Sequence, residues 1–111
     1  MDALPQELRE YVMANGRNPF REWLHVLKDD CGRAIIRVRL NRLRLGNFGD
    51  CKSVGEGVLE LRIACGPGYR VYFGRDGHTL VVLLCGGDKG SQSRDVARAK
   101  EFWLDYRRRE S

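Results

Sequence analysis

Hydrophobic and polar residues follow two periods along this chain, and the change of period separates predicted strands from predicted helices. Residues 7–13 alternate loosely and predict a first strand, which Gly16 ends. Asn18 and Pro19 then form an N-cap followed by proline at the first helical position. The apolar stripe of this first helix, at i, i+3, i+4 and i+7, consists of Phe20, Trp23, Leu24 and Leu27. A turn is expected at residues 29–32.

Residues 32–49 fit both the alternating pattern of a strand and the 3.6-residue pattern of a helix. Residues 37–40 alternate like a strand, but this alternation stops at Asn41, whereas a helical stripe continues. That stripe consists of Ile36, Leu40 and Leu43. The segment is therefore predicted to be a second helix. Residues 46–49 are expected to end it, and a loop through residues 51–53 is expected to lead to a sheet.

Residues 58–85 predict three strands joined by two tight turns. Gly66-Pro67-Gly68 reads as a three-residue loop and Asp76-Gly77 as a two-residue turn. This register pairs Arg62 with Tyr72 and places Arg70 diagonally from Arg62. Because side chains alternate across a strand, one face, expected to lie in solvent, would carry Glu60, Arg62, Arg70 and Tyr72. The apolar face would carry Leu59, Leu61, Ile63, Tyr69, Val71 and Phe73, together with Leu80, Val82 and Leu84.

A last helix is predicted to begin at Ser91 or Ser93. Its apolar stripe of Val96, Ala99 and Trp103 should cover the second side of the strand at residues 80–85, which is apolar on both faces. The order of elements predicts one α+β domain over residues 1–111. Its architecture would be a small antiparallel sheet packed by an N-terminal helix pair, with a C-terminal helix.

Composition narrows the class of protein. The chain of 111 residues is 42% hydrophobic and 32% charged, which is typical of a globular domain. It has no membrane-spanning run and no signal peptide, so a cytoplasmic protein without a membrane partner is expected. The four cysteines form no C-x-x-C pair and lie apart from both histidines, so neither a metal nor another cofactor is expected. The net charge of +5 includes an acid-free run of arginines from Arg33 to Arg44, which favours a polyanionic partner.

The segments ELRIACGPGYRVYF and LLCGGDKGSQSRDVARAKEFW resemble the killer proteins of bacterial addiction modules in the RelE/ParE toxin superfamily. The resemblance covers nearly the whole chain, including NPFREWL and the arginine-rich second helix. It implies a RelE/ParE-like fold and a role as the toxin of a type II toxin–antitoxin module. Such a toxin is neutralised by a helix-turn-helix antitoxin, and it would reach operator DNA only through that antitoxin. RelE-like members cleave mRNA on the ribosome without a metal ion, whereas ParE-like members inhibit DNA gyrase.

We expect the first activity, that of an mRNA endoribonuclease which inhibits translation. The alternatives are a non-enzymatic gyrase inhibitor and an inactive module that only binds its antitoxin. In RelE-type cleavage the 2′-hydroxyl of the RNA attacks the adjacent phosphate, so the protein must move protons and stabilise phosphoryl charge. The candidate catalytic residues for this chemistry are Arg62, Arg70, Lys89, Lys52 and Tyr72.

The resemblance gives roles to Arg62 and Lys52, and the predicted sheet gives roles to Arg70 and Tyr72. Arg62 would stabilise the phosphate, and Arg70 would either reach the same phosphate or pair with Glu60. Lys52 lies where RelE-like enzymes place general-base lysines, and Tyr72 would orient or stack on a base or else serve as an ordinary strand tyrosine. RelE-like enzymes also carry an arginine on the last strand and a tyrosine beyond it. Residues 80–85 contain neither, so the general acid is unassigned.

The arginines of the second helix have two interpretations. They would contact RNA phosphates, each contact adding salt-sensitive affinity, or they would form the surface on which an acidic antitoxin segment lies. The two interpretations are compatible and both stay open at this point. The residues concerned are Arg37, Arg39, Arg42 and Arg44.

Overall fold

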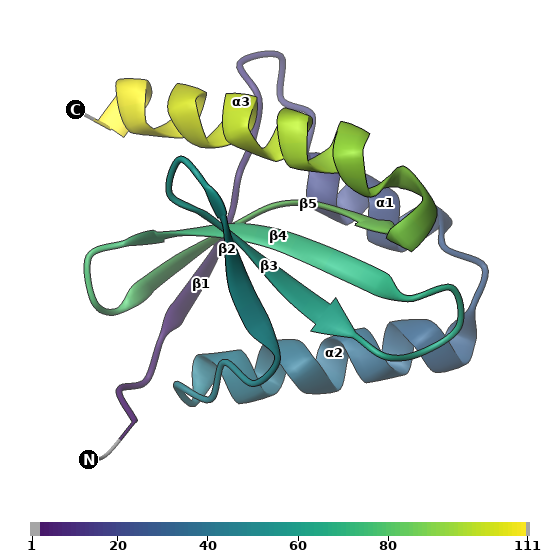
Figure 1. Ribbon diagram of the computed structural model, residues 1–111. Helices are drawn as coiled ribbons and strands as arrows, with labels where there is room; N and C mark the ends of the chain where they lie inside the picture. Colours follow the sequence, from purple (N-terminus) through teal and green to yellow (C-terminus); the bar gives the residue numbers. More distant parts are fainter. Residues whose placement is uncertain (1–2, 111) are drawn as a thin grey trace.

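The computed structural model describes residues 3–110, which form a five-stranded sheet with helices on both faces (Figure 1). In chain order the elements are β1 (Glu7–Glu10), α1 (Pro19–Val26), α2 (Asp30–Arg44), β2 (Cys51–Gly55), β3 (Val58–Ile63), β4 (Tyr69–Asp76), β5 (Leu80–Asp88), the short 3₁₀ helix η1 (Lys89–Ser91) and α3 (Gln92–Glu110). The α+β class is confirmed. None of the helices within residues 3–110 combines the length and apolar character needed to cross a bilayer.

The sheet has the strand order β1-β5-β4-β3-β2. Strand β1 runs parallel to β5, and the other neighbouring pairs are antiparallel. The expectation of a purely antiparallel sheet is therefore wrong, because the N-terminal strand joins the sheet beside the last strand and runs in the same direction. The expected loop at residues 51–53 is also wrong, since these residues belong to β2 and pair with β3.

Side-chain caps set the start of α1 and α2. The Asn18 side chain accepts a hydrogen bond from the backbone N–H of Arg21 at 3.0 Å, which confirms the predicted N-cap. Asp29 does the same for α2 by accepting from the backbone N–H of Gly32 at 2.9 Å. The turn expected over residues 29–32 is thus shorter, because Gly32 already lies in the first turn of α2. The helical interpretation of the following segment is confirmed.

Helices α1 and α2 cover one face of the sheet. Their buried residues Phe20, Ile36, Leu40 and Leu43 pack on Leu61, Ile63, Tyr69, Val71, Phe73, Val81 and Leu83. Helix α1 lies behind β5, whereas α2 runs below β3 and β4 (Figure 1). The two helices therefore cover different parts of this face.

Helix α3 covers the other face, as predicted. Its buried residues Ala99, Phe102, Trp103 and Tyr106 pack with Tyr11, Val58, Tyr72, Val82, Leu84 and Cys85. Strand β5 is consequently buried on both sides, which explains its apolar run. Gly74 of β4 lies directly under the Trp103 ring, where any side chain would overlap it.

Both turns of the meander differ in length from the prediction. Ile63 pairs with Tyr69, so the first loop spans five residues instead of three. This shift by two residues keeps every side chain of β3 and β4 on its predicted face. Asp76 pairs with Leu80, so the second turn has three residues, and its Gly77 adopts a positive φ of 73°.

This change of the second turn reverses the faces of β5, because a shift by an odd number of residues moves each side chain to the other side. Leu80, Val82 and Leu84 therefore lie on the α3 side and not beside Leu61. A register irregularity between Tyr72 and Phe73 further alters the pairing of β4 with β5.

Candidate functional site

Four of the residues predicted to be catalytic share one face of the sheet, the face covered in part by α3. Lys52 pairs with Glu60, and Glu60 pairs with Tyr72; Arg62 and Arg70 form the next row of the sheet. Paired residues of antiparallel strands point to the same side, as do alternate residues of one strand. The prediction that Arg62, Arg70 and Tyr72 share a face with Glu60 is confirmed.

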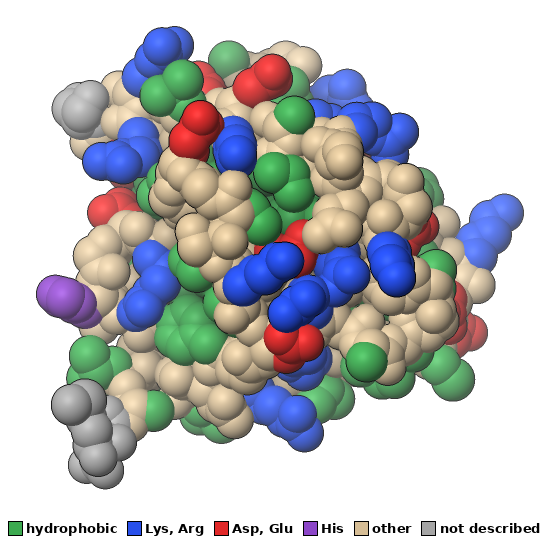
Figure 2. Space-filling model, in the orientation of Figure 1, with side chains coloured by type: hydrophobic (Ala, Val, Ile, Leu, Met, Phe, Trp, Pro, Cys, Tyr) green, Lys and Arg blue, Asp and Glu red, His purple; other side chains and the backbone are tan. Residues whose placement is uncertain are grey.

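The row with the two arginines lies beyond the N-terminal end of α3. The side chain of Gln92, the first residue of α3, contacts Glu60, which lies in the row next to the arginines. From there the helix runs away from the arginines, and its Trp103 packs over Gly74. Figure 2 shows basic side chains gathered over the front of the sheet, below α3. We call Lys52, Arg62, Arg70 and Lys89 the basic face.

Arg62 and Arg70 lie directly opposite each other, not diagonally as expected. Both side chains are half-buried, and the Nε atom of each is buried without a hydrogen-bond partner. Arg62 Nη2 lies 3.4 Å from Asp50 Oδ1, at the margin of the sheet. Like charges at opposed strand positions destabilise a sheet. The structure therefore holds two positive charges together at the open end of this face.

Tyr72 is completely buried, so its expected position in solvent is wrong and its ring cannot stack on a base. Its hydroxyl donates to Glu60 Oε2 at 3.2 Å, and the Gln92 side chain donates to the same oxygen at 2.7 Å. Burial, followed by the nearby Glu60 carboxylate, raises the pKa of Tyr72. Glu60 is also fully buried, and it forms no ion pair with Arg70 among the described residues. Tyr72 and Gln92 together fix this carboxylate beneath the basic face.

Gln92 was not identified from the sequence. It follows the G-G-D-K-G-S segment and carries no motif that would distinguish it from a solvent-exposed residue at a helix start. Its role depends on where α3 begins over the sheet, which only the tertiary structure fixes.

Lys89 and Lys52 lie on either side of the arginine row. Lys89 opens η1 just after β5, next to the β3–β4 loop, where a Cβ on Gly68 would lie 3.6 Å from its own Cβ. The Asp88 side chain caps η1 by accepting from Gly90 N at 2.8 Å, so Asp88 has a structural role. Both lysines are exposed. Within residues 3–110, neither lysine nor Arg70 makes an ion pair.

The arginines of α2 do not form one surface. Arg37 and Arg44 are seven residues apart and share one flank of the helix, and Arg39 lies on the other flank. Arg42, four residues after Val38, points away from the sheet between the two flanks. Arg39 is half-buried, and its Nη1 donates to the backbone carbonyl of Arg62 at 2.6 Å. Arg39 therefore ties α2 to the end of β3.

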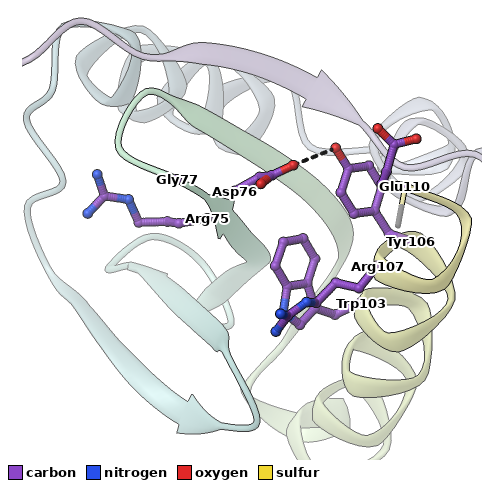
Figure 3. Close-up of a pocket in the computed structure, with 7 residues that line it drawn as sticks. All are labelled: Arg75, Asp76, Gly77, Trp103, Tyr106, Arg107 and Glu110. Atoms are coloured by element: carbon purple, nitrogen blue, oxygen red, sulfur yellow. Dashed lines mark hydrogen bonds between the residues drawn. The ribbon is translucent and has the colours of Figure 1, made fainter.

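A separate cavity of about 290 Å³ lies at the opposite end of α3 (Figure 3). It is lined by Arg75, Asp76, Gly77, Trp103, Tyr106, Arg107 and Glu110. The Tyr106 hydroxyl donates to Asp76 Oδ2 at 3.3 Å, and the Tyr106 ring stacks on Trp103 at 5.3 Å. Trp103 lies eleven residues after Gln92, or about 16 Å along a helix. This mixed-charge cavity is thus remote from the basic face.

Comparison with known proteins identifies one relative. The chain is 52% identical over 81 residues to an uncharacterized protein of Haemophilus influenzae, and the match covers 73% of this chain and 82% of that protein. No family model and no solved structure matches the chain.

Proposed function

The chain belongs to the family of this Haemophilus influenzae protein, and we propose that it is the toxin of a type II toxin–antitoxin module that cleaves mRNA on the ribosome. The proposal combines the resemblance of its sequence to RelE/ParE toxins with one observation from the fold. That observation is the opposed pair Arg62 and Arg70, whose Nε atoms lack hydrogen-bond partners at the open end of the α3-covered face.

The arginine pair supplies the electrostatic part of such a reaction. The 2′-oxygen of the RNA forms a bond to the adjacent phosphorus while the bond from phosphorus to the 5′-oxygen breaks, leaving a cyclic phosphate and a 5′-hydroxyl. Negative charge grows on the phosphoryl oxygens in the transition state. Arg62 and Arg70 are fixed on two hydrogen-bonded strands, so they stabilise this charge with little reorganisation.

The two lysines supply the proton transfers. Lys52, in the row next to Arg62, takes the proton of the 2′-hydroxyl. Lys89, at the other end of the arginine row, returns a proton to the 5′-oxygen. Tyr72 acts indirectly, because its hydroxyl holds the buried Glu60 carboxylate and does not reach the surface.

A specific feature of β5 favours gyrase inhibition as the second candidate function. RelE-like enzymes carry an arginine on this strand, but here Gly87 lies opposite Arg70. A side chain at Gly87 would overlap the Asp95 carboxylate, so this position serves packing. A ParE-like inhibitor of DNA gyrase would need no residue for catalysis at this point.

Mapping of RNA 5′-ends minutes after induction in cells tests the proposal. The wild-type chain should produce new in-frame cuts within translated messages, and Arg62→Ala should abolish them. Arg107→Ala, which removes the same charge at the far end of α3, is the matched control and should cut like the wild type. Growth arrest without new cuts would refute the nuclease proposal and favour gyrase inhibition.

A further inference from the structure

The side of α2 that faces away from the core is unexpectedly apolar. Cys31, Ala34, Ile35 and Val38 follow the i, i+3, i+4, i+7 spacing of a single helical stripe, and Leu45 lies seven residues beyond Val38. All five are exposed; Ile35 retains 40%, Val38 47% and Leu45 70% of its accessible surface. A helix packed on a sheet normally presents polar residues on this side. We call these five residues the outer stripe.

Basic residues border the outer stripe on both sides. Arg37 and Arg44 lie along one flank and Arg39 along the other, while Arg42, four residues after Val38, lies in line with the stripe between Val38 and Leu45. Within α2 the only acidic residue is Asp30, at the N-terminal end, where its carboxylate pairs with Arg33 at 2.9 Å. Figure 2 shows hydrophobic and basic side chains together along the lower edge of the molecule, where α2 lies in Figure 1.

An apolar stripe bordered by basic residues favours one kind of partner. RNA would be attracted by the arginines but would gain little from a central row of aliphatic side chains. A second copy of the chain would bring the same arginines against each other, which costs free energy at close range. An amphipathic helix with apolar residues in its centre and carboxylates along its borders complements both features, in the manner of helix-in-groove recognition.

We infer that the outer stripe of α2 docks an acidic amphipathic helix of the antitoxin. The inference rests on the proposed toxin function and assigns the α2 arginines to protein contact in place of RNA contact. The Arg39 guanidinium donates to the Arg62 backbone carbonyl, so it links α2 to the end of β3. The basic face lies on the opposite, α3-covered side of the sheet, so the antitoxin chain that follows the bound helix would have to pass around the edge of the sheet to cover the arginine pair.

The test separates toxicity from neutralisation. The double variant Ile35→Glu/Val38→Glu puts two carboxylates on the outer stripe without disturbing the core, since both positions are exposed and glutamate favours helix. Leu104→Glu, at a residue of α3 with 52% exposure, is the matched control. In cells that also express the antitoxin encoded beside the gene, the double variant should arrest growth while the wild type and Leu104→Glu are neutralised.

Calorimetry with the purified antitoxin gives a readout that does not depend on RNA cleavage. The double variant should bind at least tenfold more weakly than Leu104→Glu, while its circular dichroism spectrum matches the wild type. Unchanged affinity would overturn the inference and leave the proposed toxin function intact. The inference would also be overturned by a concentration-dependent dimer of the toxin alone that the double variant abolishes. Conversely, weakened antitoxin binding would support it even if no RNA is cut.

Discussion

The opposed arginines predict that one substitution at the basic face raises stability while it removes function. Arg70→Gln keeps much of the aliphatic stem and deletes the charge that faces Arg62, whose pairing with Asp50 is unaffected. Opposed strand residues have Cβ atoms about 5 Å apart. If the two guanidinium groups diverge to about 7 Å, they repel by about 0.6 kcal/mol in water and about 2.4 kcal/mol at an effective dielectric constant of 20. Because both side chains are half-buried, we expect the free energy of unfolding to rise by about 1 kcal/mol.

For a chain of this size, that gain corresponds to a rise of about 4 °C in the thermal midpoint. Differential scanning calorimetry and urea unfolding measure it. The gain should shrink in 1 M NaCl, where the Debye length falls to about 3 Å. Inorganic phosphate at constant ionic strength should stabilise the wild type more than the variant, because ligand binding to the native state raises stability.

Arg75→Gln is the matched control on the same strand. It removes the same charge, but the Arg75 guanidinium lies 4.5 Å from the centre of the Phe48 ring and donates to the His78 carbonyl at 3.1 Å. Its loss should lower stability. A midpoint for Arg70→Gln that equals or falls below that of the wild type in low salt would refute the view that the pair is under repulsion.

Three further predictions test hydrogen bonds that stabilise the fold around the site. Tyr72→Phe removes one of the two donors to the buried Glu60 carboxylate, so urea unfolding should show a loss of about 1–3 kcal/mol. Asn18→Ala removes the N-cap of α1 and should cost about 1 kcal/mol in the same assay. The hydrogen bond to Asp29, followed by burial, raises the pKa of Tyr69 to about 12. The folded state therefore holds this proton more tightly, and its contribution to stability, complete below pH 10, should be lost as pH rises to about 12; Tyr69→Phe should flatten that decline.

The sequence predicts the helices of this fold well because their signals are local. Asn18-Pro19 is a complete start signal within two residues, and the stripe of α2 continues past Asn41 where the strand pattern stops. Strand β1 was also recognised, but its partner was not. Its parallel pairing with β5 joins segments more than seventy residues apart, and no local pattern encodes that.

The candidate site was predicted in part for a similar reason. Arg62 and Arg70 were placed on one face because an error of two residues in the loop preserves the alternation of side chains. In the next turn the predicted register was wrong by an odd number of residues, so the two faces of β5 were assigned the wrong way round. The burial of Tyr72 and the contact of Gln92 with Glu60 depend on the position of α3 over the sheet, which the helical stripe alone does not specify.

Cleavage in a reconstituted translation reaction tests the central claim most directly. Purified ribosomes, a defined message and the purified toxin are combined, and RNA ends are located by primer extension. We predict in-frame cuts that require ribosomes, that Arg62→Ala eliminates, and that Arg107→Ala leaves at the wild-type rate. An intact message in the presence of folded wild-type toxin, together with loss of gyrase supercoiling activity in a parallel assay, would contradict the nuclease account.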